Sequence, residues 1–146
     1  MLFITIIIIS AYICYKDITE RRIPNAAQYL ILLIGFVYLS VHGISPTDWS
    51  SLSIPAGVIL VGALISRINI IGFGDVKLIF STLLLVNPEH YYDVLMFIVF
   101  AGGIWSVIWQ YFLSGLSLIK KIDRVGVGIP YGIPIVVGLC LFTFVS

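Results

Sequence analysis

The sequence predicts an all-α, polytopic membrane protein with six transmembrane helices, built as a single membrane-embedded domain over residues 1–146. Three observations lead to this fold class. Hydrophobic residues make up 60% of the chain and charged residues only 10%, whereas a soluble domain is about a quarter charged because its surface faces water. Six apolar stretches follow one another, separated by short polar breaks. All eight lysines and arginines fall in or directly beside alternate breaks.

The six apolar stretches have lengths suited to helices that cross, or nearly cross, a bilayer. A crossing takes about 20 residues, with a range of about 17 to 25. The second, fifth and sixth stretches reach this length with modest extension, and the first does so by including Lys16 and Asp17. The fourth has only about 14 residues even when extended back to Phe73, so we expect the loop before it to dip below the lipid head groups, buried against protein. The stretches are Leu2–Tyr15, Ala26–Val41, Leu52–Ser66, Val76–Val86, Val94–Leu113 and Ile129–Val145.

The distribution of charge predicts the topology of these helices. Cytoplasmic loops are enriched in Lys and Arg. The basic residues of this chain lie in or directly beside the first, third and fifth breaks, which we therefore place inside. The loops with Asp48 and Glu89–Asp93, and both termini, are then outside. No basic residue precedes the first stretch and no A-x-A pattern follows it, so we expect a retained helix rather than a signal peptide. The eight basic residues are Lys16, Arg21, Arg22, Arg67, Lys77, Lys120, Lys121 and Arg124.

The composition argues against several classes of function. A net charge of +1, with no basic patch interleaved with aromatic residues, gives no reason to expect a nucleic-acid partner. Cys14 and Cys140 do not form a C-x-x-C pair, so no zinc or other metal site is expected. We expect no disulfide between them either, because the topology places them at different depths. No cofactor is implied.

Two inward breaks carry acidic residues in a context unlike that of simple spacers. Asp17 falls on the last turn of the first helix, and Pro24 can occupy the first turn of the second, where its missing N–H is harmless. Asp75 follows Gly72 and Gly74, which permit positive φ angles or a close backbone approach, and it opens the fourth helix. Both carboxylates are therefore expected at the inner face of the membrane.

Two carboxylates in a poorly hydrated site cannot both ionise cheaply, so they share one proton. The ionised member can take a proton from water while the protonated member polarises a peptide carbonyl. The pair titrates as a unit, although the helix-start position of Asp75 favours its ionised form and hence the role of base. Asp17 and Asp75 are thus candidates for an aspartic peptidase pair that needs neither a metal nor a nucleophilic side chain.

Other interpretations of the same residues stay open at this point. The carboxylates could instead pair with neighbouring Lys and Arg side chains at the head groups, bind protons or cations in a small transporter, or belong to a non-catalytic scaffold. Lys77 could reach lipid phosphate or tune Asp75. His42 and His90 are expected at the outer face, away from the carboxylates, and Trp105 and Trp109 are interpreted as packing or interfacial residues.

The motifs resemble those of the type IV prepilin peptidase family, a group of membrane aspartyl peptidases. Gly72-Phe73-Gly74-Asp75 matches the family's G-x-G-D motif, and the segment from Asp17 to Ile23-Pro24-Asn25 is similar to its upstream motif. Ile129-Pro130-Tyr131-Gly132 extends the resemblance into the last stretch. The resemblance as a whole covers nearly the entire chain.

The resemblance implies that Asp17 and Asp75 are catalytic and that the enzyme removes a short basic leader from prepilin-like precursors at the cytoplasmic face of the inner membrane. The supporting residues would then be Gly72, Gly74, Lys77, Pro24 and Asn25. Candidates for substrate entry would be Pro130, Tyr131 and Gly132. The chain lacks the C-x-x-C region of larger bacterial members, which also N-methylate the pilin, so methyl transfer is not expected. It is most similar to the short forms of tight-adherence (Flp) pilus systems and to archaeal preflagellin peptidases.

Overall fold

The computed structural model describes residues 2–42, 49–68, 71–113, 115–116 and 129–145. Asp48, Lys120, Lys121 and Arg124, which contributed to the predicted topology, lie outside the described residues. The charge pattern can therefore be followed in the structure only for the remaining basic residues.

The described part of the chain contains six α-helices and no strand, which confirms the all-α class. A 3₁₀ turn, η1 (Pro88–His90), precedes the fifth α-helix, and a short π-helical segment, η2 (Trp109–Leu113), continues it. Each predicted stretch coincides with a helix, although most helices extend beyond the apolar run into polar flanks. The helices are α1 (Leu2–Glu20), α2 (Asn25–His42), α3 (Trp49–Arg67), α4 (Phe73–Leu85), α5 (Tyr91–Ile108) and α7 (Gly132–Val145).

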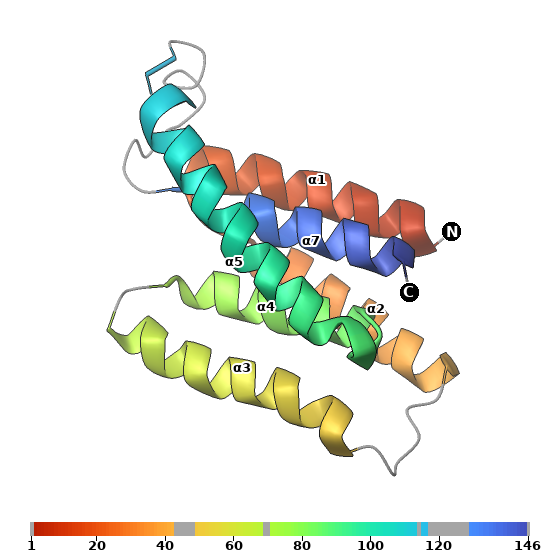
Figure 1. Cartoon of the computed structure of the whole chain (residues 1–146). Coiled ribbons are helices and arrows are strands. Elements are labelled where there is room, and N and C mark those ends of the chain that lie inside the picture. The colour runs from red at the N-terminus through yellow and green to blue at the C-terminus, as the bar shows by residue number, and fades with distance from the viewer. Residues whose placement is uncertain (1, 43–48, 69–70, 114, 117–128, 146) are drawn as a thin grey trace.

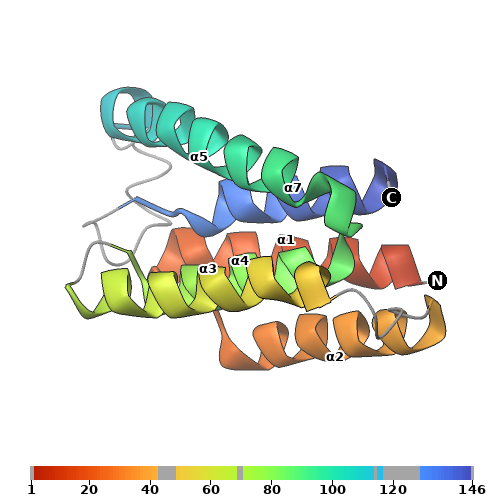
Figure 2. The same ribbon diagram turned by 60° about the horizontal axis from the view of Figure 1, so that its bottom comes forward.

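Helix α4 lies near the centre of the bundle, where it packs against α2, α3 and α7. Helix α7 in turn packs against α1 and α5, so that α3 and the α1–α7 pair lie on opposite sides of α4 (Figure 1). In the turned view, α2 and α5 form the two outer layers (Figure 2). Isoleucine and leucine side chains from four helices fill the interior, including the fully buried Ile13, Ile31, Leu78 and Leu139. The two termini lie at the same end of the bundle.

Two glycines allow close helix packing, as small residues commonly do in membrane bundles. A Cβ atom at Gly62 would lie 2.4 Å from Val76 Cγ1, so α3 and α4 can approach only because no side chain is present there. A Cβ at Gly138 would lie 3.3 Å from Ile98 Cγ1, at the α5–α7 contact.

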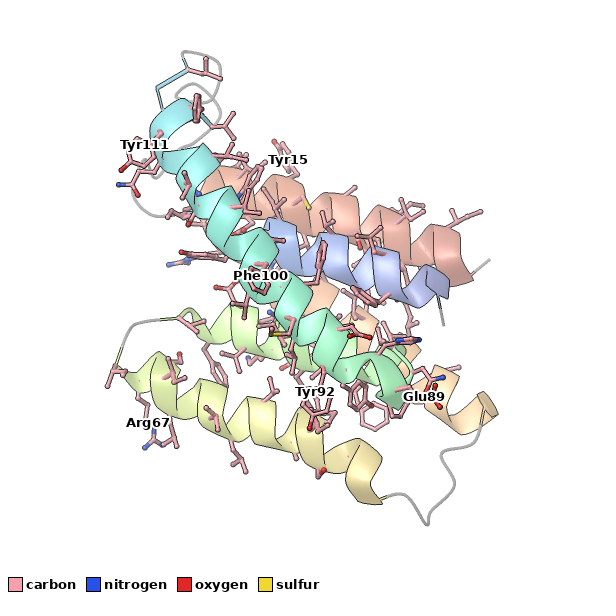
Figure 3. All side chains as sticks on the ribbon, in the orientation of Figure 1. Tyr15, Arg67, Glu89, Tyr92, Phe100 and Tyr111 are labelled. Carbon is pink, nitrogen blue, oxygen red and sulfur yellow. The ribbon has the colours of Figure 1, made fainter. Side chains whose placement is uncertain are left out.

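The outer surface of the bundle is strongly apolar. Many large hydrophobic side chains of α2, α3 and α5 face outward, among them Tyr92 and Phe100, which are 70% and 64% exposed (Figure 3). One helix of the described chain, Pro88–Leu113, is long and apolar enough to cross a membrane by length and composition. Shorter apolar helices cover Asn25–Val37, Leu52–Arg67 and Gly132–Thr143.

The two cysteines are free thiols on the facing helices α1 and α7. The Cys140 thiol donates a hydrogen bond of 3.6 Å to the Ser10 hydroxyl, one helical turn from Cys14. Along α1, Cys14 therefore lies about one helical turn from the level of Cys140, and both thiols are free.

Candidate active site

Asp17 projects from the last turn of α1, as predicted, and only 5% of its surface is exposed. The turn is held by local contacts on its other faces. The Lys16 ammonium lies 2.6 Å from Glu20 Oε1, and the Thr19 hydroxyl donates to the carbonyl of Tyr15 at 2.9 Å. These contacts continue the helix beyond its apolar stretch and hold Asp17 toward the interior of the bundle.

The chain leaves α1 through Arg21, whose φ of 52° is in the left-handed region that commonly ends helices. Its N–H donates to the carbonyl of Asp17 at 3.2 Å. Pro24 then lies immediately before α2, and its carbonyl accepts the N–H of Gln28 at 3.2 Å. The predicted position of Pro24 in the first turn is therefore off by one residue, since Pro24 occupies the cap position, where its missing N–H is equally harmless.

Asp75 lies in the first turn of α4, again as predicted. The Gly72 carbonyl accepts the N–H groups of Asp75 at 3.0 Å and of Val76 at 3.3 Å. A Cβ atom at Gly72 would lie 3.0 Å from Asp75 Oδ2, so the missing side chain leaves room for the carboxylate. The sequence offered two reasons for glycine in this loop, a positive φ angle or a close approach of neighbouring atoms. At Gly72 the close approach applies, because its φ of −65° is one that any residue can adopt.

Gln28 of α2 fastens this loop to the neighbouring helix. Its side-chain amide donates a 2.8 Å hydrogen bond to the carbonyl of Gly74, and only 2% of the residue is exposed. A Cβ at Gly74 would lie 3.6 Å from Ile23 and 3.7 Å from the Gln28 amide, an ordinary contact. The loop that carries Asp75 is therefore positioned by a buried polar contact from the segment that follows Asp17.

The start of α7 completes the surroundings of Asp17. The Gly132 N–H donates to Asp17 Oδ2 at 2.8 Å, so the carboxylate caps the N-terminus of a helix 115 residues away in sequence. A Cβ atom at Gly132 would lie only 2.8 Å from the same oxygen. The Trp105 indole of α5 donates to the Pro130 carbonyl at 3.0 Å and holds this segment against the bundle.

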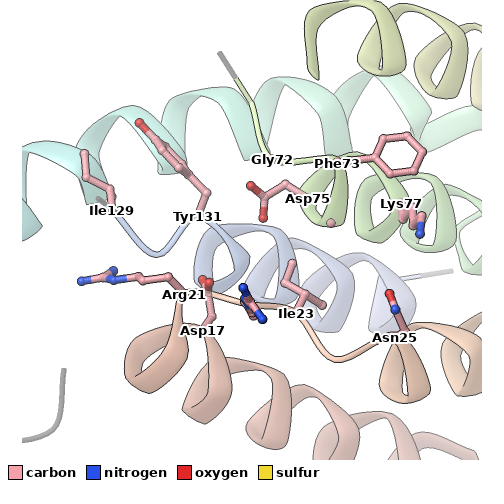
Figure 4. A pocket seen from close by; sticks show the side chains of 12 residues that line it. Asp17, Arg21, Ile23, Asn25, Gly72, Phe73, Asp75, Lys77, Ile129 and Tyr131 are labelled. Carbon is pink, nitrogen blue, oxygen red and sulfur yellow. The ribbon is translucent and has the colours of Figure 1, made fainter. Parts of the chain in front are cut away.

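The two carboxylates line one cavity of about 520 Å³ at the end of the bundle that carries Arg67, opposite Glu89 (Figures 3 and 4). Figure 4 shows Asp17 and Asp75 approaching this space from opposite sides, one from α1 and the other from α4. Seven of the ten residues predicted for the site line the cavity. They are Asp17, Asn25, Gly72, Gly74, Asp75, Lys77 and Tyr131.

The surroundings of the two carboxyls raise both pKa values, but to different degrees. Both groups lie outside the apolar stretches that precede or follow them. Burial and, to a smaller extent, the nearby Asp17 carboxylate together raise the pKa of Asp75 to about 7. Burial also raises the pKa of Asp17, whereas the Gly132 N–H and the Arg21 guanidinium oppose that rise. Asp17 is therefore the better stabilised anion of the two.

Comparison with known protein families identifies the chain from its sequence. The profile described as the type IV leader peptidase family matches residues 4–107, a segment that contains both carboxylates. The chain belongs to the type IV leader peptidase family. No curated protein and no solved structure matches it.

As a member of this family, the protein is a leader-type peptidase, and the family is associated with membranes. Within the described residues of this leader peptidase, no group of three or more His, Cys, Asp or Glu side chains is placed to hold a metal ion. His90 lies at the opposite end from the carboxylates, where its ring nitrogen is 3.3 Å from Asp93; His42 has no described side chain.

Two of the three basic side chains that line the cavity lie over aromatic rings. The Lys77 ammonium lies 4.8 Å from the centroid of Phe73, and the Arg21 guanidinium lies 4.6 Å from that of Trp109. Burial and the Asp17 carboxylate account for the raised pKa of Asp75. The interpretation of Lys77 as a group that tunes Asp75 is therefore not supported.

Sequence reasoning missed three residues that position the site. Gln28 had a detectable signal, because an amide inside an apolar helix requires a partner when it is buried. Trp105 and Trp109 were interpreted as packing residues, and they do pack, but Trp105 also holds Pro130 and Trp109 lies against Arg21. No pattern within α5 indicates these partners, which come from distant parts of the chain.

Proposed function

We propose that this leader peptidase is an aspartic endopeptidase that removes the leader of prepilin-like precursors, with Asp17 and Asp75 activating the attacking water. One observation carries the proposal. Two largely buried carboxylates, from helices that are distant in sequence, line the same cavity, which has a volume of about 520 Å³. The family match favours this activity over ion transport by the same two groups.

We assign the role of base to Asp17 and that of acid to Asp75. This reverses the expectation from the helix-start position of Asp75, because the helix dipole is worth only about 0.3 to 1 kcal/mol. Burial outweighs the helix dipole and, together with the Asp17 carboxylate, raises the Asp75 pKa to about 7. Asp17, by contrast, accepts a hydrogen bond from the Gly132 N–H and lies near Arg21, both of which favour the anion.

In the proposed reaction, the Asp17 carboxylate takes a proton from water as the water oxygen attacks the scissile carbonyl carbon. Protonated Asp75 gives its proton to the carbonyl oxygen, which forms a neutral tetrahedral diol. Asp17 then passes its proton to the leaving nitrogen while Asp75 recovers one from a hydroxyl group. The C–N bond breaks, one water is consumed, and the pair returns to its singly protonated state.

We further propose that the chain forms a single domain with six membrane crossings and both termini outside, in the inner membrane. The apolar outer faces of α2, α3 and α5 support a lipid environment. The termini and Glu89 lie at one end, whereas Arg67 and the cavity lie at the other, which we assign to the cytoplasm. Helix α4, with 13 residues, would reach only about 20 Å and would rely on its neighbours for depth.

The test is co-expression of the chain, or of variants, with a prepilin-like precursor whose shortening is followed by immunoblot. Asp17→Asn and Asp75→Asn should each abolish cleavage while the variants still insert into the membrane and unfold cooperatively on heating. Asp93→Asn is the matched control, because Asp93 is exposed at the opposite end. Cleavage by either site variant at the unaltered rate would falsify the aspartic mechanism.

A further inference from the structure

The end of α5 and the start of η2 contact two parts of the chain that lie beside Asp17. Trp105 and Trp109 are about one helical turn apart, and their ring centroids are 5.9 Å from each other. The Trp105 indole donates to the Pro130 carbonyl at 3.0 Å, and the Trp109 ring lies 4.6 Å from the Arg21 guanidinium. These two residues, the tryptophan pair, therefore join α5 to the turn after α1 and to the segment before α7.

We propose that the tryptophan pair positions Asp17 for catalysis by holding the two groups that stabilise its anion. The inference rests on the proposed aspartic mechanism, in which Asp17 is the base. One group is the Gly132 N–H, which donates to Asp17 Oδ2 at 2.8 Å and follows closely after Pro130 in the chain. The other is the Arg21 guanidinium, whose charge favours the same anion.

The hydrogen bond from Trp105 supplies a donor that the backbone of α7 lacks. Pro130 is fully buried, and a buried carbonyl requires a hydrogen-bond donor. The helical donor for this carbonyl would be the N–H four residues further on, but that residue is Pro134, which has no N–H. Trp105 therefore takes the place of a backbone donor and fixes the chain immediately before the Gly132 N–H.

Trp109 holds a charge in place without neutralising it. Only 3% of the residue is exposed, and it begins η2, where the helix changes from α to π; such wide turns are frequent at functional sites. A guanidinium over an aromatic face keeps its full positive charge, so Arg21 remains a cation beside Asp17. The other titratable or charged groups around Asp17 line the cavity or lie on α1. They are Asp75, Lys77, Arg22, Tyr131 and Cys14.

The experiment measures kcat, KM and the pH–rate profile of precursor cleavage for purified variants that unfold cooperatively. Trp105→Phe keeps a ring but removes the donor. Its kcat should fall about 3- to 10-fold, the loss expected for one hydrogen bond, with KM nearly unchanged because neither tryptophan lines the cavity. The acidic limb of its profile should move to higher pH, because a displaced Gly132 N–H favours the Asp17 anion less.

Double variants separate the contact of Trp109 from that of Trp105. Trp109→Leu should also move the acidic limb to higher pH, whereas Trp109→Phe retains an aromatic face and should restore the limb. In a chain that carries Arg21→Gln, Trp109→Leu should add no further movement, but Trp105→Phe should still add its own. Trp105→Phe alone tests the tryptophan pair should Trp109→Leu not fold.

The matched controls are Tyr111→Phe and Phe112→Leu, which remove a donor and a ring from residues of η2 that are 76% and 70% exposed. Both should leave kcat and the acidic limb unchanged. An unchanged kcat and limb in folded Trp105→Phe, or an equal movement by Trp109→Leu with and without Arg21, would overturn the positioning role. Either result leaves the aspartic mechanism intact, whereas cleavage by Asp17→Asn at the unaltered rate would overturn both.

Discussion

Replacing Gly132 with alanine perturbs the Asp17 carboxylate without altering any ionisable group. The added Cβ atom would lie 2.8 Å from Asp17 Oδ2, 3.2 Å from Cγ and 3.5 Å from Cβ. Real Cβ atoms do not approach a neighbour that closely, and ordinary contact begins at 3.4 Å. The carboxylate or the start of α7 must therefore shift by about 0.6 Å, the difference between 3.4 and 2.8 Å.

A shift of this size is large for a catalytic group. Productive geometry is held to about 0.5 Å, and a displacement of 1 Å can reduce a rate about 100-fold. The shift also weakens the hydrogen bond from the Gly132 N–H, and bonds to charged groups contribute about 1.5 to 3 kcal/mol. We therefore expect kcat/KM to fall about 10- to 100-fold, mainly through kcat, because Gly132 does not line the cavity.

The assay measures precursor cleavage by purified chain in detergent, together with the thermal unfolding temperature of each variant. Gly57→Ala is the matched control, since a Cβ at that position meets no atom within 4 Å. It should cleave at the unaltered rate. If folded Gly132→Ala also cleaved at that rate, the contact between α7 and Asp17 would have no role in catalysis and the reasoning would be refuted.

Two further predictions concern charge. Arg21→Gln removes a positive charge that holds down the Asp17 pKa, so the acidic limb of the pH–rate profile should move to higher pH; Arg22→Gln is the control, and an unmoved limb in Arg21→Gln would contradict the role. Asp75 has a higher pKa when folded, about 7 against 3.8, so it binds its proton more tightly in the folded state. Its contribution to stability is therefore lost as pH rises from 3.8 to about 7. The stability of Asp75→Asn relative to the unaltered chain should rise across this window, by up to about 4 kcal/mol at 1.4 kcal/mol per pKa unit, and a constant difference in unfolding temperature between pH 4 and pH 8 would contradict it.

The positions of the two carboxylates along their helices could be predicted from local sequence. Asp17 follows an apolar run, and Pro24 and the glycines at positions 72 and 74 mark where α2 and α4 begin. The positions of Asp17 and Asp75 at helix ends therefore needed no tertiary information. The alternation of basic residues likewise predicts one membrane face for both carboxylates, and in the structure both line one cavity. These features depend on neighbours in sequence, and the structure has them nearly where they were expected.

The contacts that position the carboxylates could not be predicted in this way. In a helix that is apolar on all sides, periodicity does not distinguish the face toward lipid from the face toward the core. The partners of Asp17 and Gly74 come from residues 115 and 46 positions away, Gly132 and Gln28. The proton assignment that we propose differs from the one predicted from sequence for a related reason, since the burial that raises the Asp75 pKa comes from the assembled bundle rather than from its own helix.

The central claim is that Asp17 and Asp75 meet at one water-accessible site, and cross-linking tests it most directly. In a chain with Cys14→Ser and Cys140→Ser, the substitutions Asp17→Cys and Asp75→Cys introduce one thiol at each position. We predict rapid joining of these thiols in native membranes by the shortest bifunctional thiol reagent, detected as a loop-closed species of altered mobility. Labelling of the two thiols from opposite membrane faces, with no cross-link formed, would contradict the account.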